Sequence, residues 1–430
     1  MRTYLIFIFM LVVTLCQAQK LLTADDAIQM ALKKNYDILI SRGEADINKT
    51  NNTAGNAGML PDIELSGSGS YSLRNSHEKL QGGIISDDSS LGTTTINTGV
   101  ALSWTLFDGG KMFVTKRKLN EIESLGELQF KVQVMQTIYD VMASYYNIVR
   151  QKQQLKSINQ TITYNKERVL IMQTAFNSGS VGKTDYLQAK IDLNVYLENA
   201  VSQQSVIDEA QRELSRLLGE SADWSFEVSD SITLNYSPDK KELQQKLYES
   251  NPTILSFQKQ TEINKLMLKE VERTRLPKIS LNGGYFYNYT GNTDGSVLVN
   301  RYLGPQIGAT LSLPIYQGGD INRQSNIAKI ELQSALYKIE GYKLQVNTEL
   351  QNALSQFENQ QKLLQIETEN AALTKENLEI SIQRLRLGQT NSLEVHLAQE
   401  EYVQSFTRLI DFQYNLKMAE TRLKQLMAEL

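Results

Sequence analysis

Two kinds of hydrophobic pattern alternate along the chain, and each occurs twice. At about residues 61–73, 94–107, 277–289 and 302–314, apolar residues alternate with small polar ones, which is the period of a strand with one apolar face. The pattern fits a half-buried soluble sheet, and it equally fits transmembrane barrel strands, which need about 9–11 residues. We expect a loop at about residues 74–93, where the chain is polar and rich in Gly.

After each strand pair the apolar spacing changes to threes and fours. This spacing continues from about residue 111 to 176 and from about 320 to 387, which predicts two helices of about 100 Å each. Helices of that length must lie against other helices, as in a coiled coil. A short turn and a returning helix follow each one, so we predict helical hairpins at 111–218 and 319–430.

Paired features at two constant spacings show that the chain is internally duplicated. The first spacing is 216 positions, and it separates the strand starts Leu60-Pro61 and Leu276-Pro277 as well as Asn35 and Asn251. The second spacing is 209 positions, and it separates the strand-to-helix junctions Gly109-Gly110 and Gly318-Gly319 as well as the turn residues Gly179 and Gly388. The difference of seven fits one length change in the loops between paired strands. We therefore predict a first repeat at 19–218, an equatorial linker at 219–237 and a second repeat at 238–430.

Each repeat is predicted to open with a further helix. The first extends to about residue 56, with Thr23 as its N-cap. The second covers about 239–275, with Pro238 at its first position, and Lys183 or Thr184 is expected to cap the returning helix of the first hairpin. In the linker, residues 226–228 and 232–234 resemble short strands.

Residues 1–18 resemble a secretory signal peptide. Arg2 precedes an apolar segment too short to span a bilayer, and cleavage is expected after Ala18. An uncleaved anchor and lipidation of Cys16 are the alternatives. Because Cys16 is the only cysteine, we expect no disulfide, thiol nucleophile or cysteine metal site in the mature chain.

Composition and motifs argue against several functional classes. The formal charge of −4 is spread among interspersed acids and bases, so no basic face suggests nucleic acid. His77 and His396 are the only histidines, and they are too far apart in sequence to suggest a metal site. No catalytic triad order, Walker loop or dinucleotide-binding motif is present, so we expect neither an enzyme nor a cofactor.

The number of strands bears on assembly. Four strands cannot close a barrel, and open strand edges are not viable in lipid. Three copies give twelve strands, enough for a barrel with a wet lumen. If the strands span a membrane, we therefore expect a homotrimer.

With these features in hand, the mature chain resembles the TolC-type outer-membrane efflux family over essentially its whole length. The features are the duplicated Leu-Pro strand starts, the junctions Phe107-Asp108-Gly109-Gly110 and Tyr316-Gln317-Gly318-Gly319, and the hairpin turns Gly179…Thr184-Asp185 and Gly388…Glu394-Val395. The resemblance implies a mostly α-helical fold with a β part: a trimeric twelve-stranded outer-membrane barrel continued by a periplasmic helical tunnel closed at its tip. It also implies an exit duct for efflux or type I secretion in the cell outer membrane, embedded in lipid, with a periplasmic adaptor and an inner-membrane pump. The alternative is an exported coiled-coil surface stalk without a pore.

The resemblance also suggests positions for the channel gate. Glu394 matches a family acidic ring at the constriction, and Leu397 replaces a second one; Glu394 could equally be an ordinary first-turn helix acid. Thr184 and Asp185 match one side of a family latch, whereas Leu385 and Thr390 depart from the other side.

The remaining site predictions concern the hairpin ends. Arg384 and Arg386 could take the place of the missing latch residues, or they could form a solvated cationic helix end. The turns at Gly179 and Gly388 are the expected adaptor contacts.

Overall fold

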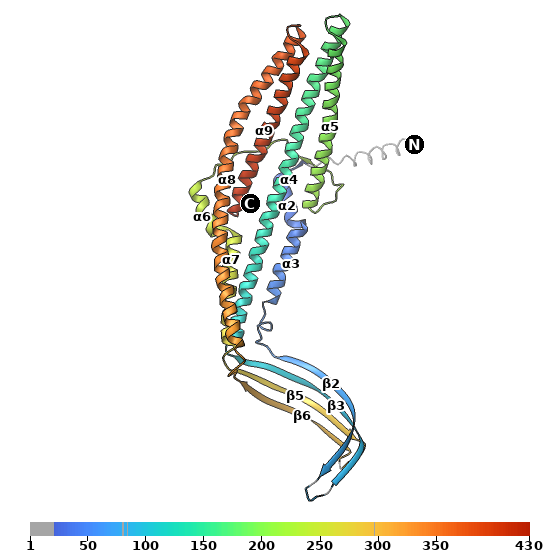
Figure 1. The fold of residues 1–430 in the computed structure, drawn as a ribbon, viewed down its shortest axis with the longest axis vertical. Helices are drawn as coiled ribbons and strands as arrows, with labels where there is room; N and C mark the ends of the chain where they lie inside the picture. Colours follow the sequence, from blue (N-terminus) through green and yellow to red (C-terminus); the bar gives the residue numbers. More distant parts are fainter. Residues whose placement is uncertain (1–20, 80, 84, 296) are drawn as a thin grey trace, which may run out of the picture. The chain divides into compact units, whose positions relative to one another are not determined.

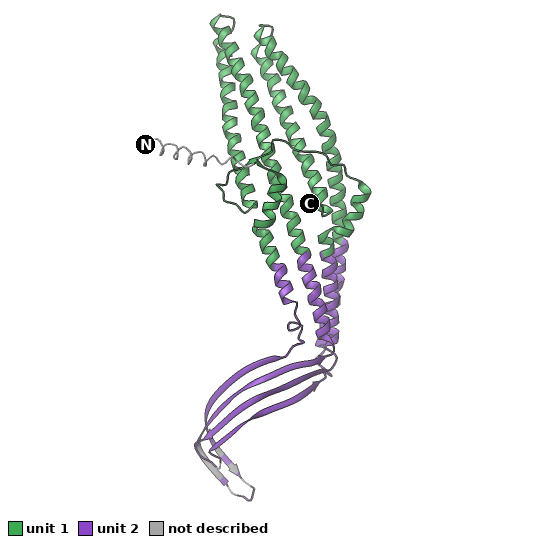
Figure 2. Ribbon diagram, turned by 180° about the vertical axis from the view of Figure 1, so that it is seen from behind, with its two compact units in different colours: residues 1–43, 128–255, 341–430 green, residues 44–127, 256–340 purple. Residues whose placement is uncertain are grey.

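The chain forms two units in the computed structural model, which describes residues 21–79, 81–83, 85–295 and 297–430. Unit 1 contains the chain up to Gly43 together with Leu128–Leu255 and Gly341–Leu430, and unit 2 contains Glu44–Glu127 and Ser256–Glu340 (Figure 2). The predicted signal peptide, with Cys16, lies outside the described residues.

Unit 2 contains a four-stranded antiparallel sheet in the order β2-β3-β5-β6 (Figure 1). Its strands are β2 (Asp62–Lys79), β3 (Ile85–Asp108), β5 (Lys278–Asn292) and β6 (Val299–Ser312). The central pairing of β3 with β5 joins the two repeats, so β2 and β6 are the edges of the sheet.

One face of this sheet is apolar and is left uncovered by the part of the chain that the structure describes. The strand register aligns Ile63 of β2 with Leu102, Gly283 and Ile307 in one row. Side chains in such a row point to the same face of a sheet. Ile63 and Ile307 are both largely exposed, so the apolar face predicted from the alternation is present but open.

Residues 74–93 do not form the predicted loop. The ladder pairs His77 with Asp87 and Lys79 with Ile85, after a register shift between Arg74 and Ser76. Strand pairing uses backbone groups, so it can continue through polar sequence. We wrongly took the absence of apolar alternation for an absence of pairing.

The hairpins of the two repeats have equal helix lengths. α4 (Lys111–Asn177) and α8 (Asp320–Arg386) each contain 67 residues, whereas α5 (Lys183–Leu217) and α9 (Ser392–Leu426) each contain 35. At 1.5 Å per residue the long helices measure about 100 Å, as predicted. Among the described residues, no helix combines the length and apolar composition that a bilayer-spanning helix requires.

A pair of glycines separates strand from helix in the first repeat and recurs in the second. Gly109 and Gly110 have φ values of 74° and 78°, and Gly318 and Gly319 have values of 61° and 78°. This left-handed conformation is costly for other residues. At Gly109, a Cβ atom would also lie 2.5 Å from the Cβ of Leu276. The backbone of this junction therefore requires glycine.

The two largest apolar cores of unit 1 are built from equivalent positions in the two repeats. Pairs that lie 209 positions apart are Val141 and Leu350, Tyr145 and Leu354, Ile148 and Phe357, Ala210 and Ala419, Leu214 and Leu423, and Leu217 and Leu426. The spacing found in the sequence thus extends to the packing. Duplication accounts for both the backbone and the core of this unit.

The helices predicted at the start of each repeat are interrupted. The first is divided into α2 (Ala24–Lys34) and α3 (Tyr36–Asn51), and the second into α6 (Lys240–Ser250) and α7 (Pro252–Arg273). Each break occurs at a buried asparagine, Asn35 or Asn251. The continuous helices predicted from the sequence were therefore wrong at these two residues.

The two asparagines make the same contacts. The side-chain oxygen of Asn35 accepts the backbone N–H of Asp37 and Ile38 at 2.9 and 3.1 Å, and its amide donates to the carbonyl of Leu217 at 2.8 Å. Asn251 accepts from Thr253 and Ile254 at 3.0 and 3.1 Å and donates to the carbonyl of Leu426 at 3.0 Å. Each asparagine therefore starts one helix and binds the end of another.

Of the three predicted helix starts, one is confirmed and two differ in the structure. Thr23 is the N-cap of α2, as predicted, and forms a capping box with Asp26. The N-cap of α6 is Asp239, whose carboxylate accepts two backbone N–H groups, so Pro238 lies before the helix. Gly182, not Lys183 or Thr184, caps α5.

The linker contains one of its two predicted strands. β4 (Glu227–Val228) pairs in parallel with β1 (Leu21–Leu22). Residues 232–234 have no strand assignment; Ile232 instead packs against the core of the first repeat.

A buried carboxylate joins α8 to α9. Glu367 accepts hydrogen bonds from Ser405 at 2.6 Å and Arg408 at 2.9 Å. Burial alone would raise the pKa of Glu367, but the hydrogen bonds from Arg408 and Ser405 outweigh it and hold the pKa below 4.5. The unfolded chain therefore binds the proton more readily. The resulting stabilisation is fully present above pH 4.5 and is lost as the pH falls through the folded-state pKa.

We expect Glu367→Gln to lower the free energy of unfolding at pH 7 by about 1–3 kcal/mol, because a charged acceptor is lost. The variant should then lose less stability than the wild type as the pH falls below about 4.5. Denaturant titrations at several pH values measure this difference. Parallel acid profiles for the two proteins would contradict the assignment.

Candidate functional site at the hairpin ends

The two hairpin turns of unit 1 are built alike. In the first, the N–H of Ser180 donates to the carbonyl of Ala175 at 2.8 Å. In the second, the N–H of Gln389 donates to the carbonyl of Arg384 at 2.8 Å. These bonds close the ends of α4 and α8, and each is followed within a few residues by the start of the returning helix.

Glu394 lies in the first turn of α9 and is bound within its own hairpin. Its N–H donates to the side chain of the N-cap Asn391 at 3.0 Å. Its carboxylate accepts hydrogen bonds from the Arg384 guanidinium and the Thr390 hydroxyl. The side chains of Arg384 and Glu394 remain 46% and 41% exposed, and Leu397 is also exposed. The predicted constriction acid is thus an ion-paired residue in contact with solvent.

The predicted latch residues divide between two arrangements. Arg386 on α8 forms an ion pair with Glu167 on α4, which joins the two hairpins. Asp185 instead accepts the N–H of Gly182 at 3.2 Å, at the start of its own helix. Among the described residues, no ion pair joins Asp185 to Arg384 or Arg386. Thr184 is exposed near this same turn.

A hollow of about 740 Å³ lies between the two hairpin ends. Asp185 lines it from the first hairpin, and Arg386, Thr390 and Ser392 line it from the second. Of the four predicted gate residues, Asp185 and Arg386 therefore line one hollow, whereas Thr184 and Arg384 are not among its lining residues.

A buried ion pair joins the helices near this hollow. Arg168 on α4 binds Asp192 on α5, and their side chains are only 3% and 9% exposed. Arg168 also donates to the hydroxyl of Ser392 at 3.1 Å, at the beginning of α9, and Gln188 donates to Asp192 at 2.8 Å. One arginine thus ties together three helices.

The sequence analysis missed this pair. Arg168 and Asp192 lie 24 positions apart on two helices with alternating charged residues, and such residues usually belong to solvated faces. Only the turn at Gly179, which folds α5 back along α4, brings them together. The predicted hairpin geometry did contain a signal. Residues at equal distances from the turn face each other across the hairpin, so a search among them for opposite charges would have found this pair.

His396 of α9 lies beside the ion pair of Arg168 and Asp192. The Nδ1 atom of His396 is 3.6 Å from the Asp192 carboxylate, and its Nε2 atom is 3.4 Å from Glu400. Nevertheless, in the described part of the chain no group of three or more His, Cys, Asp or Glu residues is arranged to hold a metal ion.

Apolar contacts complete the joint between the hairpins. Leu378 and Ile382 of α8 and Val395 of α9 pack in one buried cluster with Met172 of α4. Tyr402 of α9 packs edge-to-face against Tyr164 at a centroid distance of 6.5 Å. The hairpin ends therefore meet through a hydrophobic core with charged groups around it.

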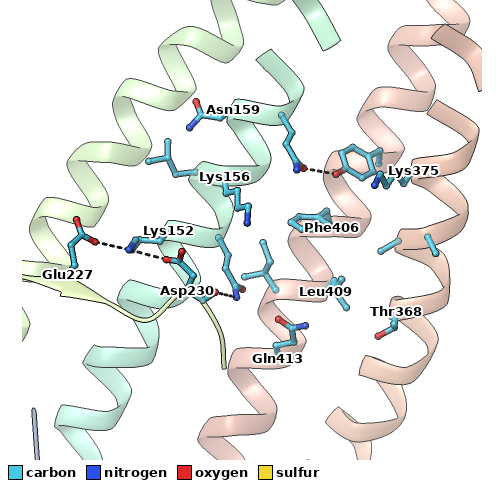
Figure 3. A pocket seen from close by; sticks show the side chains of 17 residues that line it. Lys152, Lys156, Asn159, Glu227, Asp230, Thr368, Lys375, Phe406, Leu409 and Gln413 are labelled. Atoms are coloured by element: carbon cyan, nitrogen blue, oxygen red, sulfur yellow. Dashed lines mark hydrogen bonds and ion pairs between the residues drawn. The ribbon is translucent and has the colours of Figure 1, made fainter. Parts of the chain in front are cut away.

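A second, larger hollow of about 860 Å³ lies where the linker meets α4, α8 and α9 (Figure 3). Lys152 on α4 reaches two linker carboxylates, Glu227 at 2.8 Å and Asp230 at 3.1 Å. Burial alone would lower the pKa of Lys152, but the hydrogen bonds to Glu227 and Asp230 raise it above its usual value. Lys152 therefore remains charged and anchors the linker to α4.

The duplicated strand pairs and equal helical hairpins define a class of protein, and comparison with known families identifies it. The model of the family described as outer membrane efflux protein matches residues 27–220 and 243–429. The matched segments start 216 positions apart and end 209 apart, the same spacings as in the sequence. The chain belongs to the outer membrane efflux protein family.

Individual relatives agree with this assignment. The chain is 20% identical over 336 residues to the alkaline protease secretion protein AprF of Pseudomonas aeruginosa, covering 74% of this chain and 68% of the relative. It is 20% identical over 346 residues to the outer membrane protein TolC of Escherichia coli, covering 76% of this chain and 65% of TolC. The chain thus spans about two thirds of the length of these relatives.

A solved structure shares the fold. The CmeC outer membrane channel of Campylobacter jejuni aligns with a TM-score of 0.80 and 16% identity, covering 94% of this chain and 85% of that one. At this identity the likeness describes the fold, and the function must be argued from the chain itself.

Proposed function

We propose that three copies of this chain form a passive exit duct through the outer membrane, for efflux or for type I secretion. A periplasmic adaptor contacts the turns at Gly179 and Gly388, and an inner-membrane pump supplies the cargo. The duct opens and closes at its periplasmic tip, where the hairpin ends converge. Glu394 and Leu397 line its narrowest part.

The observation that carries the proposal is the sheet with two open edges and an uncovered apolar face. Unpaired backbone groups at β2 and β6 are not tolerated in lipid, so a neighbouring chain must pair with each. Because each chain contributes an even number of strands, joining β6 to the β2 of the next copy keeps the whole ring antiparallel. Three copies close a ring of twelve.

The helices of unit 1 support the same assembly. α8 and α5 lie at the two sides of the helical layer, with α9 and α4 between them (Figure 1). Three exposed residues of α8, Ile366, Leu373 and Ile380, repeat every seven positions, which is the spacing of a coiled-coil seam. On α5, Leu187 and Ile191 are likewise exposed. Side-by-side packing of copies would cover both stripes.

Strand length counts against the alternative of a surface stalk. β2 contains 18 residues and β3 contains 24, and at about 3.3 Å per residue either exceeds the ~30 Å hydrocarbon layer even when tilted. A stalk has no use for four such strands with an apolar face.

Native mass measurement of the protein in mild detergent tests the assembly, and we expect the mass of three chains. Insertion of these trimers into planar bilayers should give discrete conductance steps that persist as the applied voltage is raised. A monodisperse monomer that remains folded without detergent would overturn the duct and favour the stalk. Reconstitution of the trimers with candidate pumps and adaptors then tests which cargo passes through the duct.

A further inference from the structure

The Glu394 carboxylate is held by the neighbouring helix of its own hairpin. Arg384 is in the last turn of α8, and Glu394 is in the first turn of α9. A cation at the carboxyl end of a helix and an anion at the amino end are each favoured by the helix dipole. The tight turn places these two ends side by side, so Arg384 and Glu394 form an ion pair where both charges are already stabilised.

This pair changes the charge of the hairpin end. A ring of three bare glutamates would carry a charge of about −3 and attract multivalent cations. With Arg384 beside each one, the charge contributed by this pair is zero in every chain.

Comparison of the two repeats shows that the turn itself does not require the arginine. Ala175 occupies the position equivalent to Arg384, 209 residues earlier, and its carbonyl closes the first turn with the same 2.8 Å bond. Asp185 is the equivalent of Glu394. The first turn therefore has the acid and the same backbone bond without a guanidinium. The Arg384 side chain is therefore not needed to form the turn, and its described ion pair is with Glu394.

We propose that Arg384 determines the ion selectivity of the duct by neutralising the Glu394 ring at its narrow end. Arg384 consequently lowers the cation preference of the tip and weakens its block by multivalent cations. This inference rests on the proposed function, since it needs a trimer whose hairpin ends line the path. Thr390 contributes by holding the second carboxylate oxygen, which orients the carboxylate toward the guanidinium.

The test uses purified full-length trimers in planar bilayers, with Arg384→Gln, Glu394→Gln, the double variant and Arg384→Lys. Hexaamminecobalt(III) is the blocking probe, and reversal potentials in a KCl gradient report selectivity. We expect Arg384→Gln to lower the half-blocking concentration by about tenfold or more and to raise cation preference, because it exposes three carboxylates. Glu394→Gln should shift selectivity toward anions.

The other two variants separate charge from structure. The double variant and Arg384→Lys should each return to within about twofold of the wild type, because both restore a neutral pair. An unchanged half-blocking concentration in Arg384→Gln trimers that conduct normally would overturn the inference. Absence of conductance in every protein, wild type included, would instead overturn the proposed duct.

Discussion

Replacing Arg168 with alanine is expected to lower the free energy of unfolding by about 3–5 kcal/mol, the usual effect of removing one partner of a buried ion pair. The Asp192 carboxylate would remain buried without its charge partner, and α9 would lose its hydrogen bond at Ser392. Denaturant titration followed by circular dichroism measures the change. Since the arginine ties three helices near the hairpin ends, the variant trimer should also open more often in bilayer recordings.

Two controls distinguish burial from charge. Arg216 forms an ion pair with Glu213 on the exposed side of α5, and Arg216→Ala should cost less than about 1 kcal/mol. The double variant Arg168→Met, Asp192→Leu removes both buried charges and should regain most of the lost stability, since apolar replacement of such pairs is often neutral. If Arg168→Ala is no more harmful than Arg216→Ala, the pair is not the joint described above.

The second large effect concerns the duplicated asparagines. Asn35→Ala removes an N-cap, which typically costs about 0.5–2 kcal/mol, and it leaves the buried carbonyl of Leu217 without its donor, about 1–3 kcal/mol more. We expect a total loss of about 2–4 kcal/mol, and the same for Asn251→Ala. Thermal and denaturant unfolding of the two variants side by side provides the measurement.

A serine at either position separates the two contributions. Asn35→Ser keeps a side-chain oxygen that can cap α3 and lacks the amide that binds Leu217, so its effect should be intermediate. Thr23→Ala, which removes an exposed N-cap, should cost about 1 kcal/mol. Equal effects of Thr23→Ala and Asn35→Ala would show that the contact with Leu217 contributes nothing.

Much of the fold could be predicted because its signals are local and occur twice. The strand alternation, the glycine pairs and the long helical stripes each identify an element, and the constant spacings of 216 and 209 relate the repeats. The helix break at Asn35 could not be predicted, because an asparagine between two helical stripes resembles any exposed polar residue. The break at Asn251 had a signal that we missed: Pro252 follows it, and a proline favours the first position of a helix and disfavours helical conformation in the residue before it. The bonds from the two asparagine amides to the carbonyls of Leu217 and Leu426 could not be predicted either, because only the folded chain brings these carbonyls near.

The site was predicted less completely than the fold. Glu394 and Arg384 were both singled out, but as members of different groups, and their pairing depends on the tight turn between them. Arg168 and Asp192 were missed because burial of a charge leaves no mark on the local sequence. The general reason is that periodicity reports which face of an element is apolar, whereas ion pairs depend on which elements meet.

The equal hairpins of the two repeats have a consequence for symmetry. A ring of three such chains presents six backbone turns of one shape, so its scaffold is quasi-sixfold. Its charges are not, because Asp185 and Glu394 occupy equivalent positions, and among the described residues only Glu394 has an arginine partner. Around the rim, three acids paired with arginine would alternate with three that accept the backbone N–H of Gly182. Any partner that docks on all six turns would therefore meet two chemically distinct classes of contact, and its affinity for each could be altered separately.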